Sequence, residues 1–180
     1  MVVLEHVSTI IFTRLNAANT YFQEVLDILG DALAVQATIN VYFDTVHTWI
    51  PIISRKRMTR NMLNPMWEAG PDLALLFLCM KLIITTPQDG LGNHQNPIYT
   101  ASKRFIALME SNGITSLLVL QAYILVALYE IGQAIYPGAW MSVGLCVRYG
   151  LLLGINGHES VADLLGLPVS NFIHNHKNWI

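Results

Sequence analysis

Apolar side chains recur at three- and four-residue intervals along most of the chain, the spacing of one face of an α-helix. The longest such stretch covers residues 113–154, and Glu130 is the only charged residue between Ser111 and Val147. Its first half places apolar residues on adjoining helical faces, which predicts a helix buried nearly all round. These residues are Leu117, Leu118, Leu120, Ile124, Leu125, Leu128 and Ile131.

A second helix is predicted after Tyr136-Pro137-Gly138, because proline and glycine together interrupt the first one. It starts at Ala139-Trp140-Met141 and runs through Arg148 toward Gly154. The two helices are expected to form an antiparallel hairpin in the core. Small residues recur where a larger side chain would hold the helix axes apart, namely Gly132, Ala134, Ala139, Gly144 and Gly150.

The remaining helices are predicted from residues that favour helix starts. The predicted starts are Asn19 or Thr20, Asp31, Ser54, Pro71, Thr100 or Ser102, and Ser160. Residues 88–97 are polar and rich in turn formers, so they are predicted to form a surface loop. No run of alternating polar and apolar residues is long enough to imply a sheet. The predicted fold class is therefore all-α, an irregular multi-helix domain built round a buried antiparallel helical hairpin.

Composition narrows the class of protein. The 180 residues suffice for one domain with one core, and 53% are hydrophobic while only 12% are charged. No apolar run reaches the roughly 18 clean residues of a membrane span, so no membrane partner is expected. Glu5 and His6 stand where a secretory signal would carry basic residues, which favours an intracellular location. With a net charge of −2 the chain is not expected to bind DNA alone.

Two blocks of sequence resemble the fungal-specific transcription factor domain, the middle homology region of fungal zinc-cluster regulators. The first block is residues 42–53, Tyr-Phe-Asp-Thr-Val-His-Thr-Trp-Ile-Pro-Ile-Ile. The second is residues 120–132, followed by Ala139-Trp140, Gly144, Arg148 and Leu153-Gly154-Ile155. The resemblance divides the chain into an N-terminal helical lead-in at 1–39, the regulatory domain at 40–168 and a divergent tail at 169–180.

The resemblance implies a regulatory and interaction domain that modulates transcription by RNA polymerase II in the nucleus, and not an enzyme. Protein partners or self-association, and a small-molecule effector, are the implied contacts. DNA would be reached only through the family's six-cysteine zinc cluster, and this chain has just Cys79 and Cys146. No cofactor is therefore expected here. The alternative is a helical small-molecule-binding protein or enzyme with an apolar pocket between the central helices.

The resemblance also implies that the domain is incomplete. In the family a further long helix packs back on the core, whereas here the resemblance stops at Leu167-Pro168 and residues 169–180 have no apolar stripe long enough for that helix. Without that helix, part of the apolar surface of the central hairpin would be exposed. An exposed apolar patch of that kind recruits a partner or aggregates, so self-association or poor solubility is expected.

No catalytic, cofactor-binding or metal-ligating residues are assigned. Asp44 and His47 lie three apart on a helix, which suits a surface hydrogen bond or, less simply, two metal ligands or a base with its orienting acid. The histidines at 174 and 176 and the pair His158-Glu159 have no further ligand nearby in sequence. The basic residues Arg55, Lys56, Arg57 and Arg60 indicate a solvated helix face, with DNA contact or nuclear import as the alternative.

Three residues are candidates for structural roles: Arg148, Glu130 and Trp140. An arginine on an apolar helix needs a partner, because an unpaired buried charge costs several kcal/mol. Glu130 is the only acid in the neighbouring helix. We therefore predict an ion pair between Arg148 and Glu130 that fixes the helix register, with a ligand-binding role for Arg148 as the alternative.

Overall fold

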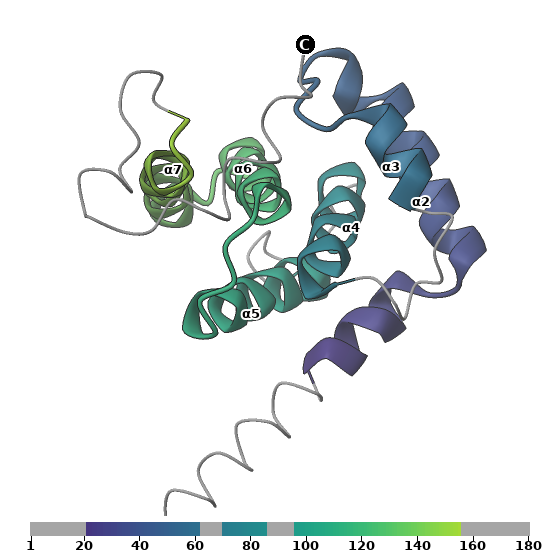
Figure 1. The fold of residues 1–180 in the computed structure, drawn as a ribbon, viewed down its shortest axis with the longest axis horizontal. Coiled ribbons are helices and arrows are strands. Elements are labelled where there is room, and N and C mark those ends of the chain that lie inside the picture. The colour runs from purple at the N-terminus through teal and green to yellow at the C-terminus, as the bar shows by residue number, and fades with distance from the viewer. Residues whose placement is uncertain (1–20, 62–69, 86–95, 156–180) are drawn as a thin grey trace, which may run out of the picture.

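The computed structural model describes residues 21–61, 70–85 and 96–155. These residues form helices joined by turns, and no strand occurs among them, which confirms the all-α fold class. Helix α4 (Pro71–Ile84) lies at the centre, with α2 (Ala32–Asp44) and α3 (Arg55–Asn61) on one side of it. Helices α6 (Leu117–Gly132) and α7 (Tyr136–Leu152) lie on the other side, and α5 (Pro97–Ser111) crosses beneath them in the view of Figure 1.

Helix α4 is buried on all sides because it packs against α2, α5 and α6. Leu75, Leu76 and Leu78 are among its nine buried residues. Pro71 occupies the first turn, where its missing N–H costs no hydrogen bond, and Asp72 lies near the positive helix end. The single lysine of α4, Lys81, donates from Nζ to the backbone oxygen of Ile28 at 2.6 Å.

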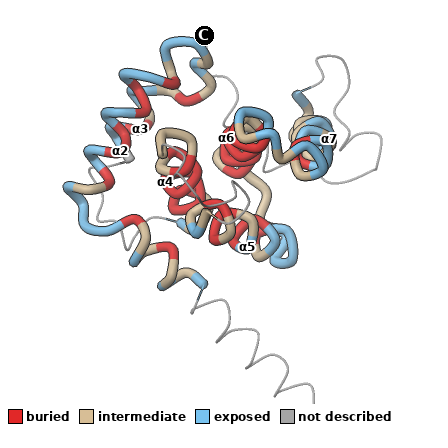
Figure 2. Tube along the Cα trace, turned by 180° about the vertical axis from the view of Figure 1, so that it is seen from behind, coloured by how far each residue is buried: buried red, intermediate tan, exposed pale blue. Residues whose placement is uncertain are grey.

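The predicted hairpin is present. Helix α7 packs along α6, and Tyr149 near its C-terminal end donates a hydrogen bond to the backbone oxygen of Ile114, just before α6 begins, at 2.9 Å. The two helices are therefore antiparallel. Their exposure differs from the expectation, however, since ten residues of α6 are buried but only Ala139 and Ser142 of α7 are. Figure 2 shows α7 at the edge of the molecule with much of its surface exposed.

Two helices begin earlier than the sequence predicted, and proline explains both. Asn96 caps α5 by accepting from the backbone nitrogens of Ile98 and Tyr99 at 2.8 and 3.3 Å, so Pro97 starts the helix. In α7, Pro137 lies inside the first turn and the interruption falls at residues 133–135 instead. Proline is favoured in a first turn because its φ is already helical.

The predicted caps of α2 and α3 are present, whereas Thr20, the cap predicted for the first helix, lies outside the described residues. Residues Tyr21–Leu29 are helical and end at Gly30, whose φ of 80° lies in the left-handed region that glycine tolerates best. The Asp31 side chain accepts from the backbone nitrogen of Ala34 at 2.8 Å and caps α2. After α2 a short 3₁₀ helix, η1 (Val46–Thr48), leads to Ser54, which accepts from Arg57 at 3.4 Å at the start of α3.

Among the described residues, no single helix has the length and apolar character needed to cross a bilayer. Tyr21–Leu29 and Ala32–Thr48 reach that length only when they are joined across a bend of 72°. The helix predicted from Ser160 and most of the loop predicted at 88–97 lie outside the described residues.

Candidate functional site

Glu130 is fully buried where α5, α6 and α7 meet. Its Oε1 accepts hydrogen bonds from the Tyr99 hydroxyl at 2.7 Å and from Lys103 Nζ at 3.0 Å. Lys103 also donates to Ser142 Oγ of α7 at 3.1 Å. Lys103 of α5 therefore links Glu130 of α6 to Ser142 of α7, and we call Tyr99, Lys103, Glu130 and Ser142 the polar centre.

The backbone of α7 approaches the polar centre closely at Gly138. A Cβ atom at this position would lie 3.0 Å from Glu130 Oε1, closer than ordinary van der Waals contact. Glycine at 138 thus lets the first turn of α7 pass over the carboxylate. The backbone reinforces this placement, because Ile135 donates to the Glu130 carbonyl oxygen at 2.8 Å.

Burial and the neighbouring carboxylate keep Tyr99 protonated. Burial raises the pKa of Tyr99 above its ordinary value, and the hydrogen bond to Glu130 raises the pKa further. Tyr99 therefore remains a phenol that donates to the acid. Within the described part of the chain, the second carboxylate oxygen, Oε2, is buried and has no hydrogen-bond partner. Tyr99, Lys103 and Ser142 thus make their hydrogen bonds within the polar centre, and these bonds hold α5, α6 and α7 together.

The predicted ion pair between Arg148 and Glu130 is wrong, because the cation beside Glu130 is Lys103 of α5. Arg148 is exposed, and its guanidinium lies against Gly144, one turn earlier on the same helix. The premise of a buried arginine therefore fails. The sequence analysis did not identify Tyr99 and Lys103, although their spacing of four residues places both on one side of α5.

An apolar groove of about 400 Å³ lies beside α6. Gln121 is its one polar side chain, and that amide donates to the Ile52 carbonyl oxygen at 2.7 Å. The amide nitrogen is thereby engaged by the backbone, and the remaining surface suits an apolar group. The groove is lined by Ile52, Leu117, Leu120, Gln121, Ile124, Gly154 and Ile155.

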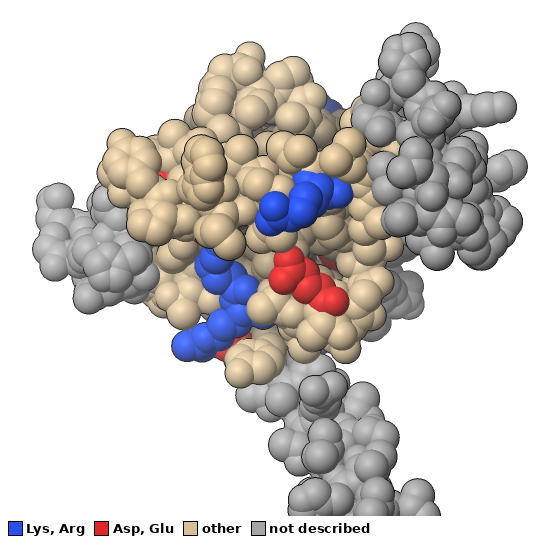
Figure 3. Space-filling model, turned by 90° about the vertical axis from the view of Figure 1, so that its left-hand side faces the viewer, with Lys and Arg blue, Asp and Glu red and all other residues tan. Residues whose placement is uncertain are grey.

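The outer side of α7 carries a row of exposed apolar residues that includes the third structural candidate, Trp140. The Trp140 side chain is 82% exposed. Its row, which we call the outer stripe, consists of Tyr136, Trp140, Val143, Val147 and Leu151. Figure 3 views the molecule from the side on which α7 lies in Figure 1, and few charged side chains appear there.

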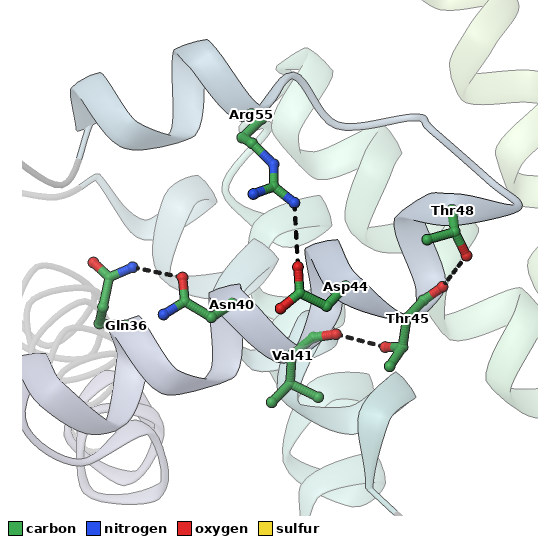
Figure 4. Close-up of polar contacts among 7 residues, drawn as sticks. All are labelled: Gln36, Asn40, Val41, Asp44, Thr45, Thr48 and Arg55. Atoms are coloured by element: carbon green, nitrogen blue, oxygen red, sulfur yellow. Dashed lines mark hydrogen bonds and ion pairs between the residues drawn. The ribbon is translucent and has the colours of Figure 1, made fainter.

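Asp44 pairs with a different residue from the one its spacing suggested. Its carboxylate lies 3.5 Å from the Arg55 guanidinium, as Figure 4 shows, and both side chains are exposed. Arg55 also covers the Phe43 ring at 4.7 Å. His47 lies in η1 with its ring edge-on to Phe43 at 4.8 Å. The predicted hydrogen bond between Asp44 and His47 is therefore wrong, because Asp44 pairs with Arg55 and His47 Nδ1 is buried with no hydrogen-bond partner among the described residues. An exposed ion pair contributes little stability, so Asp44 and Arg55 belong to a solvated helix surface.

Within residues 21–61, 70–85 and 96–155, no group of three histidine, cysteine or acidic residues could hold a metal ion. Burial raises the pKa of Cys79 to about 12 and that of Cys146 to about 11, so both thiols stay protonated at neutral pH. The pair His158-Glu159 and the histidines at 174 and 176 lie outside the described residues.

The chain is similar to known fungal regulators. The family model described as "Fungal specific transcription factor domain" matches residues 39–175. "Transcription factor BOA15" of Botryotinia fuckeliana is 39% identical over 165 residues, which cover 90% of this chain and 87% of that protein.

More distant relatives are much longer proteins. "Pigment biosynthesis transcriptional activator pigB" of Monascus ruber is 31% identical over 67% of this chain, and "Transcription factor tazR" of Aspergillus terreus is 28% identical over 61%. The chain spans only 23% and 18% of these two proteins. No solved structure matches the chain.

Proposed function

The chain belongs to the fungal specific transcription factor domain family, and on this premise we propose that it regulates transcription by RNA polymerase II in the fungal nucleus. The observation that carries the proposal is the 39% identity to Transcription factor BOA15 over nearly the full length of both proteins. The family match at 39–175 includes α3 to α7, and therefore the polar centre and the outer stripe.

The relatives suggest which genes are controlled. Three of them are named as activators of citrinin or pigment biosynthesis. We extend this role to the present chain and propose that its targets are genes for the biosynthesis of a small molecule. Deletion of its gene should then lower the transcripts of one co-regulated biosynthetic set, as measured by RNA sequencing.

A regulatory role accords with the chemistry of the described residues. Tyr99, Lys103 and Ser142 are engaged with Glu130 or with one another, and the groove amide is bonded to the backbone. Groups used in this way stabilise a scaffold and leave apolar surfaces for partners. The alternative of an enzyme is not favoured, since the relatives are transcription factors.

A reporter assay tests the proposal directly. The full chain is fused to an unrelated DNA-binding module whose operator precedes a reporter gene in a fungal host. The fusion should change reporter expression relative to the module alone, because a regulatory domain acts when it is brought to a promoter. A second fusion, which carries an unrelated helical domain of similar size, controls for the effect of attaching any domain to the DNA-binding module.

A soluble, nuclear fusion that leaves expression at the level of the module alone would contradict the proposal. Fluorescence microscopy of the tagged chain in the fungus tests the nuclear location separately. Exclusion of the tagged chain from the nucleus under all growth conditions would refute that part.

A further inference from the structure

Helix α3 concentrates much of the positive charge of the chain. It carries Arg55, Lys56, Arg57 and Arg60, which are four of the ten lysine and arginine residues in a chain of net charge −2. The helix contains no acidic residue, and its single hydroxyl group belongs to Thr59. The Thr59 side chain is exposed and therefore accessible from solvent. The function proposed above gives no role to this exposed hydroxyl group among clustered cations.

Thr59 differs in its surroundings from the other exposed serine and threonine residues of the described ranges. Three of the four residues before Thr59 are lysine or arginine. An acidic residue directly precedes two of the others, and the third has neither lysine nor arginine among the four residues before it. The other three are Thr45, Thr48 and Ser111. Among these four hydroxyl groups, an added negative charge would therefore find lysine or arginine nearby in sequence only at Thr59.

A phosphate group on Thr59 would lie beside two of these cations. It carries a charge of about −1.5 to −2 and three strong acceptor oxygens. Residues three and four positions earlier share a helix face with Thr59, which places Lys56 and Arg55 next to the phosphate. The Arg55 guanidinium now forms an exposed pair with Asp44 at 3.5 Å, as Figure 4 shows, and such a pair contributes little stability. An arginine–phosphate pair is charge-assisted and stronger, so α3 can hold the phosphate by giving up only a weak contact.

We propose that Thr59 is a phosphorylation site for a protein kinase that selects basic residues ahead of the target hydroxyl group. The cations at Arg55, Lys56 and Arg57 complement an acidic substrate-binding surface on such a kinase. Phosphorylation would reduce the four positive charges of α3 to a net charge of about +2. This site does not depend on the regulatory function proposed above.

The reaction is transfer of the γ-phosphoryl group of ATP. The Thr59 Oγ1 atom attacks the γ-phosphorus and forms a new P–O bond, while the bond from that phosphorus to the oxygen bridging the β- and γ-phosphates breaks and ADP leaves. The hydroxyl proton passes to the catalytic aspartate of the kinase. Each ATP consumed gives one phosphothreonine and one ADP.

The short length of α3 allows the kinase to reach Thr59. The Thr59 hydroxyl donates to the Arg55 carbonyl oxygen at 3.0 Å, and this hydrogen bond must break before transfer. Helix α3 has seven residues, and isolated helices shorter than about 12 residues are marginal in water. Met58 is the side chain by which α3 is anchored in the core. Local opening of α3 therefore requires less free energy than unfolding of the domain.

A kinase assay on the full chain tests the proposal. The probe is the catalytic subunit of cAMP-dependent protein kinase, which selects basic residues before its target, with radiolabelled ATP. Mass spectrometry of a digest that does not cut at lysine or arginine locates the phosphate. Thr45→Ala is the matched control for Thr59→Ala, because Thr45 is also an exposed threonine. Lys56→Ala removes one recognition cation and Lys56→Arg retains it, and circular dichroism confirms that each variant is folded.

The wild-type chain and Thr45→Ala should be labelled at Thr59, and Thr59→Ala should not be labelled. Lys56→Ala should lower kcat/KM about tenfold or more, whereas Lys56→Arg should retain the wild-type value. The tagged chain recovered from the fungus in the presence of phosphatase inhibitors should carry phosphate at Thr59.

Three results would overturn the proposal. The first is a folded wild-type chain that is not labelled under conditions in which a basic control peptide is labelled. The second is labelling that persists in Thr59→Ala or is as fast in Lys56→Ala as in the wild-type chain. The third is a chain from the fungus that carries no phosphate at Thr59 under any growth condition.

Discussion

The ion pair between Lys103 and Glu130 leads to a specific prediction about stability. Lys103→Met removes the cation from a carboxylate that is 0% exposed, while the Tyr99 hydroxyl remains as a donor. Breaking a fully buried pair costs about 3–5 kcal/mol. The Lys103 side chain is 35% exposed, so solvent already screens part of its attraction and the expected loss is about 1–2 kcal/mol.

Two further variants separate the charge from the shape of the site. Glu130→Gln keeps the size of the side chain and an acceptor for Tyr99, and should also cost about 1–2 kcal/mol because it leaves Lys103 without its anion. The double variant removes both charges, so its cost should be about 1 kcal/mol less than the sum of the two. Arg148→Met serves as the control and should change stability by no more than about 0.5 kcal/mol, because Arg148 is exposed.

Urea unfolding followed by circular dichroism measures these differences, and thermal unfolding should show about 2–4 °C per kcal/mol for a domain of this size. The reasoning fails if Lys103→Met is neutral in a folded protein. It also fails if Arg148→Met destabilises the chain as much as Lys103→Met, since Arg148 would then be the partner of Glu130 after all.

Three other predictions concern single contacts. Gly138→Ala should lower stability by about 1–3 kcal/mol in urea unfolding, because the new methyl group would press on the Glu130 carboxylate, and an unchanged midpoint would argue against the close approach. Asp31→Ala should cost about 1 kcal/mol through loss of the α2 cap, and Asp31→Asn should restore most of it, as measured by thermal unfolding.

The Tyr99 hydroxyl donates to Glu130, and the Tyr123 hydroxyl of α6 donates to Glu110 of α5. Burial first, and then these hydrogen bonds, raise the pKa of both tyrosines. Their contribution to stability is therefore complete below pH 10 and is lost as pH rises further, because the unfolded chain then releases protons that the folded chain keeps. The free energy of unfolding, measured from pH 8 to 11, should therefore fall above about pH 10. Tyr99→Phe and Tyr123→Phe should each reduce that slope by up to about 1.4 kcal/mol per pH unit.

Local sequence signals predicted much of the fold. The caps at Asp31 and Ser54 were identified correctly, because a capping side chain bonds to backbone only three residues away. The start of α7 was misplaced because proline can stop a helix or begin one, and the residues around Pro137 do not distinguish the two.

The candidate site was harder to predict, because its contacts join distant parts of the chain. Lys103 reaches Glu130 from 27 residues away, and helix periodicity does not give the rotation of α5 about its own axis. The sequence likewise did not indicate that Trp140 is exposed. A row of apolar residues on a helix predicts that the row is covered. The same spacing is expected whether the core of the chain or a separate partner covers it.

The one-sided attachment of α7 also has a consequence for how the molecule opens. Helix α4 is enclosed by three neighbours, so its amide hydrogens should exchange with solvent only when the whole domain unfolds. Helix α7 can detach by breaking its packing with α6 and a few polar contacts, so its amides should exchange through a smaller opening at a lower free energy. Each such opening would admit water to Glu130.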